Sequence, residues 1–143
     1  MKILVLNGPN LNILGSRDIE KYGSLTLKDI EDKIESEFHT HGFEFFQSNI
    51  EGELVSKIQT AIDHFDGIII NPGGYAHTSV AIKDALADCS LPKIEVHLSH
   101  LVNREDFRQV LLTASSCDGY VSGFKENSYL SGVYLLERIF TKE

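Results

Sequence analysis

Short runs of strand-forming residues alternate along the chain with stretches that have helical hydrophobic spacing. The strand-forming runs are residues 2–7, 43–48, 67–72, 93–99 and 119–124. The stretches with helical spacing are residues 26–42, 51–65, 79–89 and 127–140. Such alternation is typical of parallel sheets, because parallel strands are joined by crossovers that usually contain a helix. The sequence therefore predicts an α/β fold, a three-layer, doubly wound, five-stranded parallel sheet.

Length and composition indicate one domain and exclude two classes of partner. A chain of 143 residues can form one hydrophobic core and is short for two. The 13 basic and 21 acidic residues give a net charge of −8, which argues against nucleic acid as a partner. No apolar run approaches the roughly 18 residues of a membrane span. We therefore expect no membrane partner, no nucleic-acid partner and a cytoplasmic location.

The cysteines and most histidines lack the spacing of metal ligands. Cys89 and Cys117 stand far apart without a CxxC motif, which fits reduced thiols in a cytosolic protein. Four histidines also lack ligand spacing: His39, His41, His64 and His100. The sequence therefore predicts no metal site.

Polar side chains gather where three of the predicted strands end. In doubly wound sheets, ligands bind beyond the carboxyl ends of the strands. After the first strand come Asn10, Asn12, Arg17 and Tyr22. After the third comes NPGGYAHTS, and around the end of the fourth stand Glu95, His97, Ser99, Arg104 and Arg108. This pattern predicts a functional site at that end of the sheet.

Glu95 and His97 in IEVHLS are two residues apart, so in a strand their side chains point to the same face. A buried carboxylate costs several kcal/mol unless it is paired. A neighbouring histidine supplies the pair, and the carboxylate fixes the imidazole tautomer and favours the protonated ring, which is a competent general acid. The alternative is a structural ion pair at a strand end.

NPGGYAHTS turns from a strand into a helix. Gly73 and Gly74 allow a close approach of the backbone to a ligand, and Thr78 or Ser79 can cap the helix that follows. Asn71 and His77 would then face the cleft. The alternative is a tight turn before a capped helix, without a ligand.

The loop after the first strand carries Arg17 and Tyr22, five residues apart. A tyrosine phenol ordinarily has a pKa of about 10 and is a poor base at neutral pH. A guanidinium group at about 4 Å favours the phenolate by on the order of 4 kcal/mol at an effective dielectric of 20. Such a loop can also close over a substrate and exclude water. The alternative is a surface tyrosine beside a solvated arginine.

Two further groups of charged residues allow more than one interpretation. Arg104 and Arg108 are four residues apart in NREDFRQ. They either pair with neighbouring acidic residues on a solvent-exposed helix face, or one of them binds a substrate carboxylate. Asp84 and Asp88 lie one helical turn apart, and solvent exposure is the expected state of both.

Four segments in order resemble type II 3-dehydroquinate dehydratases (3-dehydroquinases). They are LNGPNLNILGSRDIEKYG, FFQSNIEGELV, INPGGYAHTSVAIKDAL, and IEVHLSH followed by REDFR. The resemblance runs from residue 3 to about residue 136 and implies a flavodoxin-like fold. It also implies a carbon–oxygen lyase, a hydro-lyase of the shikimate or quinate pathway. This enzyme would eliminate water from 3-dehydroquinate to give 3-dehydroshikimate, with no metal or organic cofactor and no Schiff base.

The resemblance implies a role for each matching residue. Tyr22 would remove the C2 proton, Arg17 would favour its phenolate, and Asn10 would hold a water that stabilises the enolate. His97, oriented by Glu95, would protonate the departing C1 hydroxyl. The substrate's hydroxyls and carboxylate would be bound by Asn71, His77, the Leu98–Ser99 backbone and Arg108. Residues 1–143 would then be a single catalytic domain, with a lid loop at about residues 8–24.

The resemblance further implies an assembly and shows two departures. A residue matching Asp84 reaches the neighbouring subunit's site in the family, which forms homododecamers built from trimers. Ile19 stands in the lid where the family often has proline, so lid stiffness is open. Lys125 stands where glycine is usual, in a turn without a catalytic role.

Other functions are less favoured by the same residues. A flavin or phosphate-binding module of flavodoxin type would need a Gly/Ser/Thr-rich phosphate loop after the first strand, where this chain has GPNLNILGSRD. A response-regulator-like domain would need an aspartate at the end of the third strand, where this chain has Asn71. A serine hydrolase would need a GxSxG elbow, which the sequence lacks.

Overall fold

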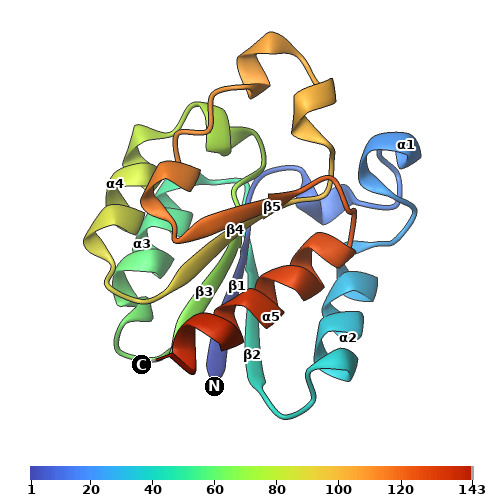
Figure 1. Ribbon diagram of the computed structural model, residues 1–143. Helices are drawn as coiled ribbons and strands as arrows, with labels where there is room; N and C mark the ends of the chain where they lie inside the picture. Colours follow the sequence, from blue (N-terminus) through green and yellow to red (C-terminus); the bar gives the residue numbers. More distant parts are fainter. Residues whose placement is uncertain (143) are drawn as a thin grey trace.

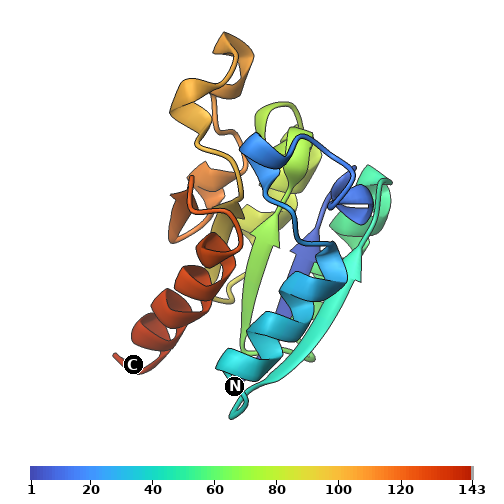
Figure 2. The ribbon, with the colours of Figure 1, turned by 90° about the vertical axis from the view of Figure 1, so that its right-hand side faces the viewer.

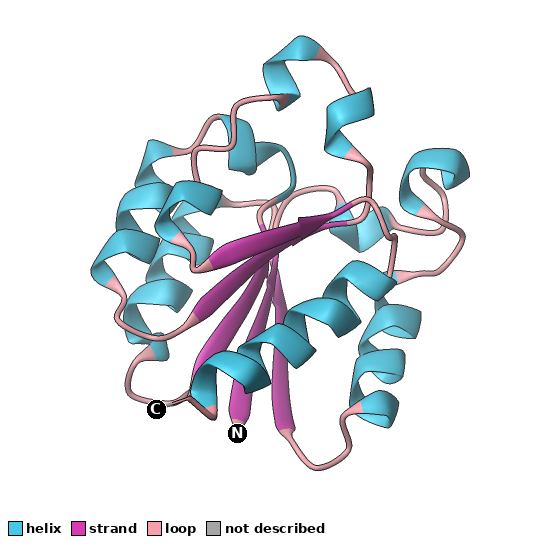
Figure 3. Cartoon of the chain, in the orientation of Figure 1, coloured by secondary structure: helices cyan, strands magenta, loops and turns pink. Residues whose placement is uncertain are grey.

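The computed structural model describes residues 1–142, which form a five-stranded sheet flanked by helices (Figures 1 and 3). The strands are β1 (Lys2–Asn7), β2 (Gly42–Gln47), β3 (Gly67–Asn71), β4 (Lys93–His97) and β5 (Gly119–Ser122). Their order in the sheet is β2-β1-β3-β4-β5, and every neighbouring pair is parallel. This is the strand order of flavodoxin-like sheets, so the predicted α/β fold is confirmed.

Two helices cover each face of the sheet, which gives the three predicted layers. The helices are α2 (Leu27–Glu37), α3 (Glu51–Ala61), α4 (Val80–Asp88) and α5 (Asn127–Phe140). On β1, alternate residues separate the two cores: Ile3 and Val5 pack with α2 and α5, whereas Leu4 and Leu6 pack with α3 and α4. Within the part of the chain that the structure describes, no helix is long and apolar enough to cross a membrane.

Side-chain caps determine where two of these helices begin. Thr26 and Asp29 form a capping box at the start of α2, with each side chain accepting a hydrogen bond from the other's backbone N–H. Ser79 caps α4, because its hydroxyl accepts a hydrogen bond from the Ile82 N–H at 2.9 Å. Of the two predicted caps, Thr78 and Ser79, the structure uses Ser79.

Several element boundaries differ from the predicted ones. The predicted helix over 26–42 ends at Glu37, because Gly42 is already the first residue of β2 and its N–H donates to the Met1 carbonyl at 3.0 Å. The chain needs the intervening residues to turn back toward β1. At the carboxyl ends, β4 stops at His97 and β5 at Ser122, each two residues earlier than predicted.

The two loops that extend beyond the sheet contain short helical turns. The loop after β1 contains a 3₁₀ turn (Leu11–Ile13) and the single-turn helix α1 (Ile19–Tyr22). Between β4 and β5 there are three 3₁₀ turns, Leu101–Asn103, Asp106–Arg108 and Ala114–Ser116, and part of this connection projects beyond the sheet (Figure 2). The alternative that places Arg104 and Arg108 on one solvent-exposed helix face is therefore wrong.

Close backbone contact joins the loops that follow β1 and β3. A Cβ atom added to Gly8 would lie 2.2 Å from the Pro72 carbonyl oxygen, which is a severe overlap. Gly73 has a φ of 61°, and a Cβ there would approach the Pro9 carbonyl oxygen to 3.0 Å. The Gly8 N–H also donates to the Asn71 carbonyl at 2.8 Å. Glycine at both positions therefore lets two polar loops meet at one place.

We expect Gly8→Ala to destabilise the fold by about 3 kcal/mol, because the new methyl group would have to displace backbone. The measurement is urea unfolding followed by circular dichroism. Gly52→Ala is the matched control, since no atom lies within 4 Å of its added Cβ. Because Gly52 lies in α3, the control should be neutral or stabilise by about 0.5–1 kcal/mol. Equal stabilities of the two variants would contradict the close-contact argument.

Candidate active site

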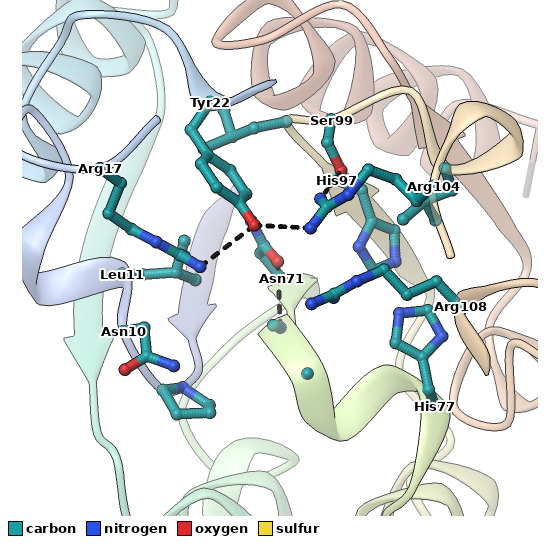
Figure 4. Close-up of a pocket in the computed structure, with 15 residues that line it drawn as sticks. Asn10, Leu11, Arg17, Tyr22, Asn71, His77, His97, Ser99, Arg104 and Arg108 are labelled. Atoms are coloured by element: carbon teal, nitrogen blue, oxygen red, sulfur yellow. Dashed lines mark hydrogen bonds between the residues drawn. The ribbon is translucent and has the colours of Figure 1, made fainter. Parts of the chain in front are cut away.

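A pocket lies where β1, β3 and β4 end, and most of its walls come from residues selected from the sequence (Figure 4). The predicted residues that line it are Asn10, Arg17, Tyr22, Asn71, His77, His97, Leu98, Ser99 and Arg108. The other lining residues are Pro9, Leu11, Gly73, Gly74, Leu101 and Arg104. The polar strand ends of the sequence thus converge on one site.

Two of the predicted residues do not line this pocket. Glu95 is fully buried on β4 and reaches the pocket only through its neighbours. Asp84 is exposed on α4. Any role of Asp84 in such a site therefore requires a second subunit, and that role stays a prediction.

Glu95 and His97 form the pair that strand periodicity predicts. The Nε2 atom of His97 lies 2.7 Å from Oε2 of Glu95. An ionised carboxylate only accepts hydrogen bonds, so Nε2 carries the hydrogen and donates it. The other ring nitrogen, Nδ1, is then the one left for a ligand. The second carboxylate oxygen of Glu95 accepts a hydrogen bond from the Thr113 hydroxyl, a partner that the sequence analysis did not identify.

Tyr22 lies between two guanidinium groups (Figure 4). Nη2 of Arg17 donates to the Tyr22 phenol oxygen at 3.1 Å, and Nη2 of Arg104 donates to the same atom at 3.0 Å. The Arg17 guanidinium also stacks on the Tyr22 ring, with its central carbon 3.9 Å from the ring centroid. Two cationic donors at one oxygen stabilise negative charge on that oxygen.

Arg104 is the main pocket residue that the sequence analysis did not assign. Because no helix forms here, Arg104 has an extended backbone after the Leu101–Asn103 turn, and its side chain is only 7% exposed. Its Nη1 donates to the Ser99 hydroxyl at 2.9 Å. Arg108 pairs with an acidic neighbour, as one of the two alternatives predicted, because its Nε donates to the Glu105 carboxylate at 2.6 Å. The same side chain also lines the pocket.

His77 has a defined tautomer and a lowered pKa. Its Nδ1 lies 2.8 Å from the Val110 carbonyl oxygen, which only accepts, so Nδ1 carries the hydrogen. Burial lowers the pKa of His77, and the positive charges of His97 and Arg108 lower it further, against the opposing effects of the Val110 carbonyl and Glu95. The neutral ring therefore keeps Nε2 as a hydrogen-bond acceptor.

The Asn71 side chain is held by a buried hydrogen-bond network that includes Tyr129 and Asn7. Its Nδ2 donates to the Tyr129 hydroxyl at 2.9 Å, and that hydroxyl donates to Oδ1 of Asn7 at 2.6 Å. Its Oδ1 accepts from the Gly73 N–H at 3.1 Å. Burial raises the pKa of Tyr129, so this phenol stays protonated and can donate. Asn71 therefore has one N–H left for a ligand.

Asn10 occupies the left-handed region, with a φ of 70°, which asparagine tolerates better than most residues. Its backbone N–H donates to Oδ1 of Asn49 at 3.0 Å. The same Asn49 oxygen accepts from Nε2 of Gln47 at 3.1 Å, so this contact ties the start of the loop to the end of β2. Asn10 therefore lines the pocket with its backbone held by Asn49, and its side-chain amide takes no part in these contacts.

A flavodoxin-like sheet with a buried Glu–His pair and clustered guanidinium groups at the carboxyl ends of its strands is typical of an α/β enzyme with a small-molecule site. Within residues 1–142, no three His, Cys, Asp or Glu side chains are grouped as a metal site requires. Comparison with known proteins identifies the family. The model of the family described as "Dehydroquinase class II" matches residues 1–137.

Relatives and solved structures agree with this match. A 3-dehydroquinate dehydratase of Nitratiruptor sp. is 48% identical over 142 residues, which cover 98% of this chain and 91% of that protein. One of Geotalea daltonii is 53% identical over 135 residues, covering 93% and 94%. The crystal structure of the type II dehydroquinase of Butyrivibrio crossotus superposes with a TM-score of 0.93 at 42% identity, covering 96% and 97%. The chain belongs to the class II dehydroquinase family and is a hydro-lyase.

The lowered pKa of His77 predicts a pH dependence of stability. As pH falls through the ordinary histidine pKa of 6.5, the unfolded chain takes up this proton before the folded protein does, so stability is lost on acidification. His77→Gln has no such group. We therefore expect wild type to lose more stability than His77→Gln between pH 7.5 and pH 5.5, measured by urea unfolding. An equal loss in the two proteins would contradict the assignment.

Proposed function

We propose that this enzyme eliminates water from 3-dehydroquinate to give 3-dehydroshikimate, as a type II dehydratase of the shikimate or quinate pathway. The names of its relatives support the substrate. The observation that carries the mechanism is the phenol oxygen of Tyr22, which accepts hydrogen bonds from Arg17 and Arg104 in the pocket that His97 also lines. This arrangement provides a base and an acid in one cavity.

In the first step the Tyr22 phenolate removes a proton from C2 of the substrate. The electron pair of the C–H bond moves toward the adjacent C3 carbonyl and gives an enolate. A guanidinium at about 4 Å from a phenolate contributes on the order of 4 kcal/mol at an effective dielectric of 20. Arg17 and Arg104 therefore supply the stabilisation that a tyrosine needs to act as a base near neutral pH.

The enolate oxygen requires a hydrogen-bond donor while it carries negative charge. We assign this role to a water molecule held by the Asn10 amide. The position of Asn10 in the pocket wall, with its backbone N–H held by Asn49, supports the assignment.

In the second step His97 donates a proton to the C1 hydroxyl as the C1–O bond breaks. The enolate electrons form the C1–C2 double bond and restore the carbonyl, and water leaves. Tyr22 has gained one proton and His97 has lost one, so exchange with solvent resets the site. Glu95 stabilises the imidazolium before transfer through its 2.7 Å hydrogen bond. Both proton transfers use side chains of the chain itself, and we propose that no metal, organic cofactor or Schiff base takes part.

The remaining pocket residues would bind the substrate's polar groups. Arg108 and the Leu98–Ser99 backbone suit the carboxylate, because a guanidinium group and backbone N–H groups donate hydrogen bonds to anions. His77 suits a hydroxyl, which can donate to its unprotonated Nε2. Asn71 suits a second hydroxyl through its remaining N–H.

We also propose the larger organisation that the family resemblance implies. Residues 1–143 act as a single catalytic domain, and residues 8–24 act as a lid over the pocket. Gly15 and Gly23, with φ values of 95° and 84°, flank the part that carries Arg17 and Tyr22, which supports a hinge role. The protein assembles in the cytoplasm as a homododecamer of trimers, in which Asp84 approaches the neighbouring subunit's pocket.

The test is to mix purified protein with 3-dehydroquinate and a chelator and to follow the ultraviolet absorbance of the conjugated enone product. We expect absorbance to rise, and to rise equally after borohydride treatment, which would trap an imine. Tyr22→Phe should lower kcat at least about 10³-fold, because the base is lost. Tyr120→Phe is the matched control, since Tyr120 is 56% exposed and outside the pocket. Wild-type turnover by Tyr22→Phe would remove Tyr22 as the base.

Arg104→Gln tests the cation that was not assigned from the sequence. A charge-assisted hydrogen bond to the phenolate is worth about 1.5–3 kcal/mol, so kcat should fall about 10- to 150-fold. Arg138→Gln is the control, because Arg138 is exposed near the end of α5. Steady-state kinetics under the same assay gives the comparison. Unchanged kcat in Arg104→Gln would show that Arg17 alone supports the base.

A further inference from the structure

Glu95 has a second buried partner besides His97. Its carboxylate is 0% exposed on a central strand, where an unpaired charge is strongly unfavourable. One oxygen accepts the hydrogen of His97 Nε2, and the other accepts the hydroxyl hydrogen of Thr113. Thr113 is itself 0% exposed and does not line the pocket. Its hydroxyl therefore acts on the carboxylate and not on a ligand.

The short segment around Thr113 is also fixed to the turn that carries His77. The N–H groups of Leu112 and Thr113 donate to the Ala76 carbonyl at 2.8 and 3.3 Å. In the opposite direction, Nδ1 of His77 donates to the Val110 carbonyl at 2.8 Å. Residues 110–113 therefore contact His77 through the Val110 carbonyl, and they reach His97 through the Thr113 hydroxyl and Glu95.

We propose that Thr113 is a positioning residue for the elimination, which holds the ionised Glu95 carboxylate in the orientation that binds His97. This inference rests on the proposed function of His97 as the acid. Without the hydroxyl, one carboxylate oxygen would be left in the core without a donor. The carboxylate would then be free to rotate, which would weaken its hold on the His97 imidazole.

The surroundings of Glu95 leave few groups that could replace this hydroxyl. Cys117 lies near Glu95, and its thiol donates weakly to the Thr113 carbonyl at 3.7 Å. Burial, together with the negative charge of Glu95, raises the pKa of the Cys117 thiol to about 12. The thiol therefore stays neutral. Among the described residues, the hydrogen bonds to the Glu95 carboxylate come from His97 and Thr113.

The test compares Thr113→Val, which removes the hydroxyl at nearly constant shape, with Thr113→Ser, which keeps it. We expect Thr113→Val to lower kcat about 10- to 100-fold with KM changed less than about 3-fold, and Thr113→Ser to stay within about 3-fold of wild type. If Thr113→Val does not fold, Thr113→Ala against Thr113→Ser gives the same comparison, because both lack the γ-methyl group. Thr60→Val is the control, since Thr60 is exposed on α3.

A spectroscopic measurement separates this inference from the activity itself. The proton on His97 Nε2 can be followed by NMR in histidine-labelled protein and assigned by its loss in His97→Gln. Thr113→Val should shift or broaden this signal, and Thr60→Val should not. An unchanged signal with unchanged kcat would overturn the positioning role, as would equal losses of kcat in Thr113→Val and Thr113→Ser. If the wild-type protein has no dehydratase activity, the proposed function fails, and the NMR comparison still tests the contact.

Discussion

The burial of one carboxylate on the central sheet organises the chemistry of this protein. Glu95 lies on β4 with no exposure to solvent, so its charge has to be matched by neighbouring donors. His97 and Thr113 supply them. Replacing a buried ionic pair by apolar residues often leaves a protein as stable or more so, which makes stability a weak reason to keep one here. A charge that orients an imidazole at the carboxyl end of a parallel sheet fits the catalytic role that we propose for the pair.

The local charge of the pocket is opposite to the charge of the whole chain. The protein carries a net charge of −8, yet Arg17, Arg104 and Arg108 all line one small cavity. Bulk charge governs solubility and long-range attraction, whereas these three side chains determine which ligand is stabilised once it is inside. Two of the guanidinium groups contact the Tyr22 phenol oxygen, whereas Arg108 donates to the Glu105 carboxylate and also lines the pocket.

The acid and the base of the proposed reaction have different supports. His97 is the last residue of β4 and is held by the sheet and by Glu95. Tyr22 belongs to the loop after β1, and its phenol oxygen accepts hydrogen bonds from Arg17 of the same loop and from Arg104 beyond β4. Because Arg104 also donates to Ser99 at the end of β4, it links the loop to the rigid half of the site. This single side chain therefore couples the position of the base to that of the acid.

The sequence by itself determined the order of strands and helices along the chain, a helix cap at Thr78 or Ser79 and the shared face of Glu95 and His97, because these depend on periodicity and on contacts between near neighbours. It also placed most pocket residues, because polar side chains at the ends of parallel strands converge. It listed Arg104 among the polar residues after the fourth strand but could not predict its contact with Tyr22, because the helical spacing of Arg104 and Arg108 was misleading in a segment of 3₁₀ turns. The sequence could not predict the contacts of Thr113 and Tyr129 either, since their hydrogen bonds reach partners 18 and 122 residues away. Only the tertiary structure decides such contacts, because sequence patterns report which face a residue occupies and carry no record of the distant group that it meets there.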